Sequence, residues 1–197
     1  CYMFNEDLFP QLDGDEFVYL DQDILIHNSI DSLFLRDTNN PWIVRGWWND
    51  TENCKKNYGK IKSTPLNSSI IRWNRGQLKP VYDHINDHAD YIFFTYSTID
   101  NYFNHFWYNL YDEFEAETSM LDDIKKGEST KKLFRGFEQG IAYSWYKGNI
   151  FPEDMDLNKV RTDNMICLFN NSYSINAGKT GDEHMYEIDE VKKLWNI

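Results

Sequence analysis

Hydrophobic and polar residues follow each other along the chain in short runs that predict strands mixed with helices. Runs rich in β-branched and aromatic residues are typical of buried strands, and apolar residues at three- and four-residue spacing are typical of helices. We predict strands at 17–26, 42–48, 66–73, 142–146 and 165–169. We predict a short helical turn within 28–34 and helices at 78–90, 98–114 and 188–195, with 91–96 either a strand or the start of a helix. This mixture predicts an α/β fold.

Length and composition fit a single domain with a sizeable core. The chain has 197 residues, of which 41% are hydrophobic and 17% aromatic, and we predict one domain over 1–197. The net charge of −12 argues against nucleic acid as a general partner, because phosphate backbones need clustered Lys and Arg. It leaves nucleotides open as ligands, because a divalent cation can screen their phosphates.

Cysteine usage and hydropathy bear on location. Cys1, Cys54 and Cys167 are widely spaced and match neither a zinc site nor a disulfide framework. This favours a reducing, cytoplasmic environment. No run of eighteen apolar residues occurs in the sequence, so we predict no membrane-spanning helix.

The predicted strand at 17–26 is interrupted by two acidic residues, Asp21 and Asp23. Side chains two positions apart on a strand point to the same side, so we expect both carboxylates to project together from the strand end. Two carboxylates that close repel each other unless a cation lies between them. Oxygen ligands suit Mg²⁺ or Mn²⁺, which favour a bound diphosphate. Alternatively, the strand ends at Leu20 and the acids are solvated turn residues; the apolar residues at 24–26 favour the metal site.

Two histidines, His84 and His88, are spaced by four residues on the predicted helix at 78–90. This spacing allows zinc binding, but the Glu that lies between the two histidines of a zinc protease helix is absent. A solvated helix face is the preferred interpretation.

Several stretches together resemble the GT-A-fold nucleotide-sugar glycosyltransferases, closest to the glycogenin-like and lipopolysaccharide-galactosyltransferase-like group. Residues 18–26 and 30–34 are similar to a strand ending Tyr-Leu-Asp-x-Asp, then aliphatic residues and a short helix. Residues 66–73 resemble that group's Asn and small residues opening a strand. Residues 99–103 are similar to its Asp-Gln motif at the head of a helix, and 141–147 resemble a late Tyr-Ser-Tyr-Lys strand. The order agrees over about residues 1 to 150.

The resemblance implies a GT-A mixed sheet flanked by helices and a metal-dependent glycosyltransferase. Such an enzyme moves a sugar from a nucleotide-diphosphate donor to a carbohydrate or other hydroxyl acceptor. Asp21 and Asp23 would then hold Mn²⁺ or Mg²⁺ on the donor diphosphate, where the metal acts as a Lewis acid.

The resemblance also implies residues that contact the sugar. Asn67 would hydrogen-bond the transferred sugar, with Ser68 and Ser69 leaving room beside it, although Asn and Ser are also common at strand entries. Asp100 would lie near the sugar hydroxyls as the catalytic candidate, with Asn101 in place of the group's Gln. Asp100 equally fits an acidic residue that complements the dipole at a helix N-terminus.

The chain departs from the family pattern at two places. Asn170 stands where the family has a metal-binding His in the pattern F-H-G-x-x-K-P, and no Lys-Pro follows closely. An Asn carbonyl can bind a hard cation, but it is neutral and weaker than a charged ligand. Only about twenty residues precede Asp21, where such enzymes carry two or more βα units. We therefore expect a chain lacking part of the N-terminal nucleotide-binding half.

Two alternative functions remain open from the sequence. One is a non-catalytic binding or relic domain of the glycosyltransferase type. Asn170 and the short segment before Asp21 favour this interpretation. The other is an Asp-x-Asp phosphohydrolase with Asp21 as nucleophile and Asp23 as acid/base. In phosphatases of the haloacid-dehalogenase type, a small residue and Thr follow the second Asp, whereas Ile24 and Leu25 follow Asp23 here.

Overall fold

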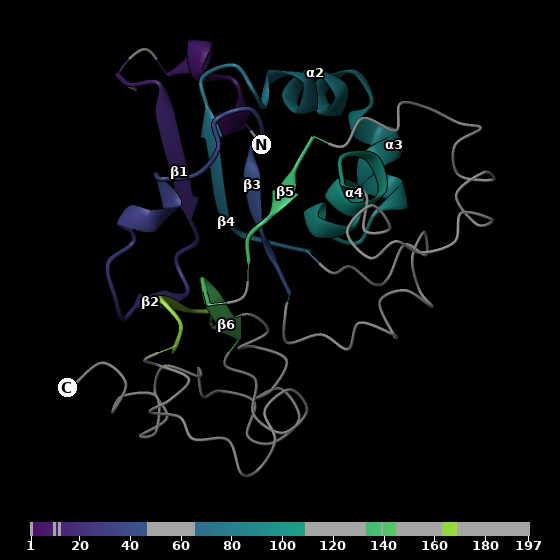
Figure 1. Ribbon diagram of the computed structural model, residues 1–197. Coiled ribbons are helices and arrows are strands. Elements are labelled where there is room, and N and C mark those ends of the chain that lie inside the picture. Colours follow the sequence, from purple (N-terminus) through teal and green to yellow (C-terminus); the bar gives the residue numbers. More distant parts are fainter. Residues whose placement is uncertain are drawn as a thin grey trace, which may run out of the picture. The chain divides into compact units, whose positions relative to one another are not determined.

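The computed structural model describes residues 2–9, 11, 13–46, 66–108, 133–138, 140–144 and 163–168. The predicted α/β class is confirmed, because the described residues form mixed sheets and helices (Figure 1). The chain divides into two compact units: unit 1 comprises Cys1–Tyr19 and Asp31–Phe137, and unit 2 comprises Leu20–Ile30 and Glu138–Ile197. The assignment of 1–197 to one domain stays a prediction.

Unit 1 contains a four-stranded sheet, sheet A, with strand order β1-β4-β3-β5 (Figure 1). Its strands are β1 (Glu16–Leu20), β3 (Trp42–Arg45), β4 (Leu66–Asn74) and β5 (Arg135–Gly136). Strand β3 runs antiparallel to β4 and parallel to β5. The predicted strands beginning at 42 and 66 are therefore confirmed.

Among the described residues of unit 1, three 3-10 helices and three α-helices accompany sheet A. The 3-10 helices are η1 (Tyr2–Phe4), η2 (Glu6–Leu8) and η3 (Asp31–Leu33), and the α-helices are α2 (Lys79–Asp87), α3 (Ala89–Thr95) and α4 (Ile99–Phe106). Helix η3 confirms the predicted turn within 28–34. Pro80 lies in the first turn of α2, where its missing N–H costs nothing. The predicted helix at 78–90 ends at Asp87, and a second helix begins at Ala89, so 91–96 is mainly helical.

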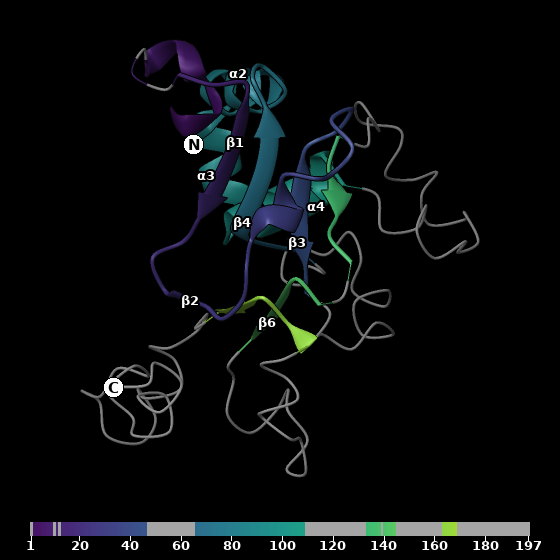
Figure 2. The same cartoon turned by 60° about the vertical axis from the view of Figure 1, so that its left-hand side comes forward.

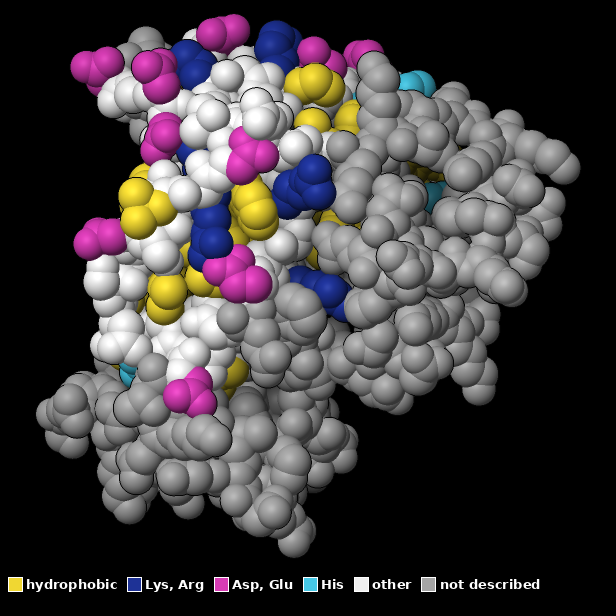
Figure 3. All heavy atoms as spheres, in the orientation of Figure 1, with side chains coloured by type: hydrophobic (Ala, Val, Ile, Leu, Met, Phe, Trp, Pro, Cys, Tyr) yellow, Lys and Arg dark blue, Asp and Glu magenta, His cyan; other side chains and the backbone are white. Residues whose placement is uncertain are grey.

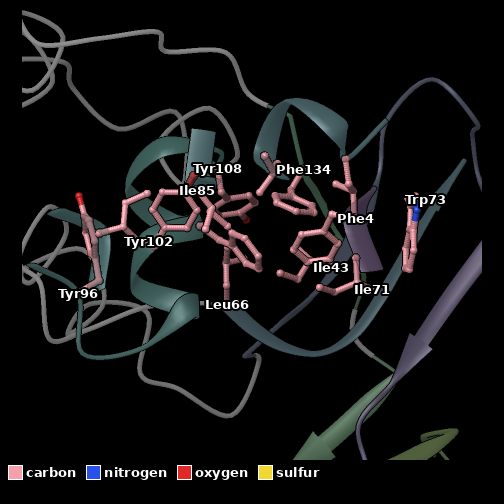
Figure 4. Close-up of a cluster of buried hydrophobic side chains, with 14 residues drawn as sticks. Phe4, Ile43, Leu66, Ile71, Trp73, Ile85, Tyr96, Tyr102, Tyr108 and Phe134 are labelled. Carbon is pink, nitrogen blue, oxygen red and sulfur yellow. The ribbon is translucent and has the colours of Figure 1, made fainter. Parts of the chain in front are cut away.

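The hydrophobic core of unit 1 lies between sheet A and its α-helices, which occupy one face of the sheet (Figure 2). Figure 4 shows side chains from β3, β4, α4 and the N-terminal η1 gathered in this core. Phe103 of α4 is fully buried, and its ring centroid lies 5.9 Å from that of Phe4 and 5.1 Å from that of Phe134. Through this aromatic cluster, helix α4 therefore packs against residues close to the first and the last residue of unit 1 in the sequence.

Two buried charged groups are held at the ends of β1 and β4. The Glu6 carboxylate accepts a hydrogen bond from Trp73 Nε1 at 2.7 Å and lies 3.3 Å from the backbone N of Gly76. Arg72 is fully buried on the sheet face opposite the core residues Ile71 and Trp73, and its Nη2 lies 3.0 Å from a Glu16 carboxylate oxygen. A buried guanidinium needs such a carboxylate, because an uncompensated buried charge is strongly destabilising.

Unit 2 contains a three-stranded sheet, sheet B, with strand order β2-β7-β6. Its strands are β2 (Ile24–Ile26), β6 (Ala142–Ser144) and β7 (Ile166–Leu168). Strand β2 is antiparallel to β7, with Ile24 opposite Leu168, and β6 is parallel to β7, with Tyr143 opposite Cys167. The predicted strands at 142–146 and 165–169 are confirmed over the residues that the structure describes.

The prediction of one continuous strand at 17–26 is wrong. Strand β1 ends at Leu20 and belongs to sheet A, and β2 begins at Ile24 and belongs to sheet B. The intervening residues, Asp21 to Asp23, form a bend. Two like charges with a polar residue between them favour a chain that leaves the sheet here, where the carboxylates reach solvent.

Several predictions lie outside the described residues: the end of the strand at 42–48, the helix at 98–114 beyond 108, and the helix at 188–195. On the face shown in Figure 3, Lys and Arg side chains of the described surface lie among Asp and Glu side chains. Within the described ranges, no helix has the length and apolar character needed to cross a bilayer.

Candidate functional site

The acidic pair lies in the bend between β1 and β2, in unit 2. Asp21 is partly exposed and Asp23 is exposed, and Asp21 Oδ1 accepts a hydrogen bond from the backbone N of Gln22 at 2.9 Å. Neither aspartate lies within a strand, because β1 ends at Leu20, as the alternative interpretation has it. The expected common projection of the two carboxylates stays a prediction. The two aspartates are separated by one residue in the bend, and the negative charge of Asp21 acts on the carboxyl group of Asp23.

Partial desolvation raises the pKa of Asp23, and the negative charge of Asp21 raises this pKa further, while a backbone hydrogen bond lowers it. Both upward effects disfavour the ionised carboxylate, and a bound cation would oppose both. The metal-free pair is therefore electrostatically unfavourable at neutral pH. A positive charge nearby would lower the pKa of Asp23 again.

Asp23→Asn is expected to raise the unfolding temperature of the metal-free protein at pH 7. An acid whose pKa is raised on folding destabilises the fold above that pKa, and this penalty disappears as the pH falls and the group is protonated. The gain corresponds to at most about 0.5 kcal/mol, because Asp23 is exposed and screened by solvent. Thermal unfolding in EDTA, followed by circular dichroism at pH 7 and at about pH 3, should show a rise only at pH 7. A lower unfolding temperature at pH 7 would mean that the ionised Asp23 stabilises the fold.

The third residue predicted to hold the metal, Asn170, lies outside the described residues. It follows Leu168 by two positions, and Leu168 pairs with Ile24, the residue directly after Asp23. Within the described residues, no group of three or more His, Cys, Asp or Glu side chains is placed to hold a metal ion. Two carboxylates nevertheless fit Mg²⁺ in a nucleotide site, where the ion commonly has one or two protein carboxylates and takes its other ligands from phosphates and water.

A second cluster of predicted site residues forms in unit 1, where the head of α4 meets the start of β4. Asp100 Oδ1 accepts a hydrogen bond from the backbone N of Ser68 at 2.8 Å. Asn67 Oδ1 accepts one from the backbone N of Ser69 at 3.0 Å. The structure thus brings Asp100 together with the segment 67–69. That these residues contact a sugar stays a prediction. Asp100 is half-buried, so this carboxylate is a positioned hydrogen-bond acceptor that solvent still reaches.

Local sequence explains how α4 presents Asp100. Thr98 caps the helix, because its Oγ1 accepts a hydrogen bond from the backbone N of Asn101 at 3.3 Å. Asn101 is buried, and its Nδ2 donates to Ser97 Oγ at 2.9 Å. Asp100 therefore lies in the first turn, where the helix dipole favours a negative charge. Asn101 is occupied with this cap, a role that the resemblance did not suggest.

Two histidines make contacts that the sequence patterns did not reveal. In unit 2, His27 Nε2 lies 2.8 Å from Tyr143 Oη, and the two rings stack at 12°. In unit 1, His84 is half-buried rather than solvated, and its Nδ1 lies 2.8 Å from Tyr102 Oη. The solvated-face interpretation of His84 is therefore wrong, because α2 packs this residue against α4. Neither tyrosine lies near its histidine in sequence, so no short motif could have indicated these pairs.

Comparison with known proteins adds no relative: no protein-family model matches the chain, and neither a curated protein nor a solved structure matches it significantly. The functional interpretation therefore depends on the residues and contacts described above.

Proposed function

We propose that this chain is a GT-A-type glycosyltransferase domain that transfers a sugar from a nucleoside-diphosphate donor to a carbohydrate or other hydroxyl acceptor. The observation that carries the proposal is the acidic pair at the head of β2. Partial desolvation and the charge of Asp21 both raise the pKa of Asp23. A divalent cation with a diphosphate would relieve this unfavourable arrangement.

In this proposal Asp21 and Asp23 bind Mn²⁺ or Mg²⁺ on the donor diphosphate. When bound, the metal supplies charge neutralisation for the departing nucleoside diphosphate. The two carboxylates orient the diphosphate through that ion. Asn170 would add a neutral oxygen ligand.

The cluster around Asp100 is proposed to bind the sugar. A carboxylate accepts hydrogen bonds from neighbouring hydroxyl groups and orients the ring by doing so. Asn67 would offer an amide beside it, and the small side chain of Ser68 would leave space for a ring, whereas Ser69 is buried. The hydrogen bond from Ser68 N to Asp100 supports this assignment, because it fixes the carboxylate against the segment that carries Asn67.

The direct test is calorimetric titration of UDP into the full chain, once with Mn²⁺ and once with EDTA. We expect binding that requires Mn²⁺, and the same protocol with other nucleoside diphosphates would identify the preferred base. Equal binding with and without the metal would contradict the proposed role of the acidic pair. Absence of binding for every nucleoside diphosphate tested, in folded protein, would reject a donor site in this chain.

A non-catalytic glycosyltransferase-like binding domain is the second candidate. The neutral Asn170 in place of a histidine favours it, because a weaker ligand set holds the metal less tightly through turnover. The distinguishing measurement is nucleoside-diphosphate release from UDP-sugars, offered with and without simple sugar acceptors. Metal-dependent UDP binding with no release from any donor would favour the binding domain, and release would favour the enzyme.

A further inference from the structure

The end of helix α2 brings two imidazole rings together on the surface of unit 1. His84 lies in the last turn of α2, and His88 directly follows the helix, with its backbone N donating to His84 O at 3.1 Å. The ring centroids of the two histidines are 4.8 Å apart, and the rings are inclined at 54°. His88 is exposed, so solvent and ions reach the pair from its side.

This separation matches two histidines bound to one metal ion. Metal–nitrogen bonds of about 2.0–2.1 Å, at angles between octahedral and tetrahedral values, place two imidazole centroids about 4.5–5.2 Å apart. The observed 4.8 Å lies within this range. The two rings are therefore close enough for one ion to contact a nitrogen of each.

The surroundings of His84 fix the orientation of its ring. Its Nδ1 lies 2.8 Å from Tyr102 Oη, and its ring stacks on Tyr102 at 14° and contacts Phe106. Histidines that bind metals commonly donate the proton on their other ring nitrogen to a fixed acceptor. With the proton on Nδ1 and donated to Tyr102, the lone pair for a metal is on Nε2.

We propose that His84 and His88 form a binding site for a late first-row divalent metal ion, Zn²⁺, Ni²⁺ or Cu²⁺, with water completing the coordination. Imidazole nitrogen favours these ions over Mg²⁺ and Mn²⁺, which prefer oxygen. The site is thus chemically distinct from the acidic pair of unit 2, and it does not depend on the proposed glycosyltransferase activity. Because His88 also precedes the first residue of α3, a bound ion would stabilise the junction of α2 and α3.

The test is calorimetric titration of Ni²⁺ into the full chain without nucleotide, with His88→Ala and His105→Ala as matched variants. His105 is a second helical histidine bonded to a tyrosine hydroxyl, that of Tyr96, but its own ring pairs with no second histidine among the described residues. We expect a saturable site in the wild type and in His105→Ala. In His88→Ala we expect this site to be lost or at least tenfold weaker.

Tyr102→Phe provides an independent variant that removes only the hydroxyl group. Loss of a partner that orients a metal-binding histidine typically lowers metal affinity by about 10- to 100-fold, and we expect a reduction in this range. Unchanged Ni²⁺ affinity in His88→Ala would overturn the proposal, and so would an equal loss in His105→Ala. Since His88 is exposed, its replacement should leave the circular dichroism spectrum unchanged.

Discussion

Replacing both aspartates of the bend, Asp21→Asn/Asp23→Asn, is expected to remove the Mn²⁺-dependent part of UDP binding. The substitution keeps the size and polarity of both side chains and deletes the two negative charges that would hold the cation. We expect an affinity loss on the order of 100-fold, equivalent to about 2.7 kcal/mol. Calorimetric titration of UDP at saturating Mn²⁺, compared with the wild type, measures the loss directly.

The chain offers a closely matched control for this experiment. Asp13 and Asp15 are also two positions apart, are exposed, and precede β1, so Asp13→Asn/Asp15→Asn makes the same change of charge in unit 1. We expect this variant to bind UDP as the wild type does. Similar losses in the two double variants would show that overall negative charge, rather than the bend at Asp21 and Asp23, governs metal-dependent binding.

The largest expected effect on stability comes from Phe103→Ala. Phe103 is fully buried and contacts the rings of Phe4, Tyr102 and Phe134. Truncating a buried Phe removes transfer free energy and leaves a cavity, which together cost about 3–5 kcal/mol. This is a large part of the total stability of a typical domain. Urea unfolding followed by fluorescence should show a much lower midpoint.

Phe94→Ala serves as the control for the same chemical change. Phe94 lies on α3 with a relative exposure of 93%, so we expect a change within about 0.5 kcal/mol. Equal midpoints for Phe103→Ala and Phe94→Ala would contradict the aromatic core assigned to unit 1. A lower denaturant slope in Phe103→Ala would instead show that its denatured or native state differs in compactness from that of the wild type.

Local patterns in the sequence predicted those strands and helices in which hydrophobic residues recur at the spacing of the buried face. Strand β4 alternates between core residues such as Ile71 and Trp73 and residues on the opposite face, and Pro80 marked the first turn of α2. The strands at 142 and 166 were also predicted, because short apolar runs with aromatic or β-branched residues are typical of buried strands. The resemblance implied that Asn67 and Asp100 both lie near the sugar, but no spacing rule indicated the hydrogen bond from Ser68 N to Asp100.

Residue types left two possibilities open at the acidic pair, one continuous strand or a strand that ends at Leu20, and did not decide between them. Aliphatic residues on both sides of the acidic pair fit one long strand as well as two short ones, and only the partner strands distinguish them. Those partners are distant in sequence: β1 pairs with β4, and β2 pairs with β7. The burial of His84 escaped prediction for the same reason, since Tyr102 and Phe106 come from another helix.

The pairing of β2 with β7 has a consequence for synthesis on the ribosome. Leu168 follows Ile24 by about 140 residues, so at about 5–20 residues per second β2 emerges roughly 7–30 s before the strand that pairs with it. During this interval β2 is an unpaired apolar segment of the kind that associates with other nascent chains. Asp21 and Asp23 directly precede it. Charges beside an apolar strand discourage such association, so we expect the same two carboxylates to protect the nascent chain before any ligand can bind.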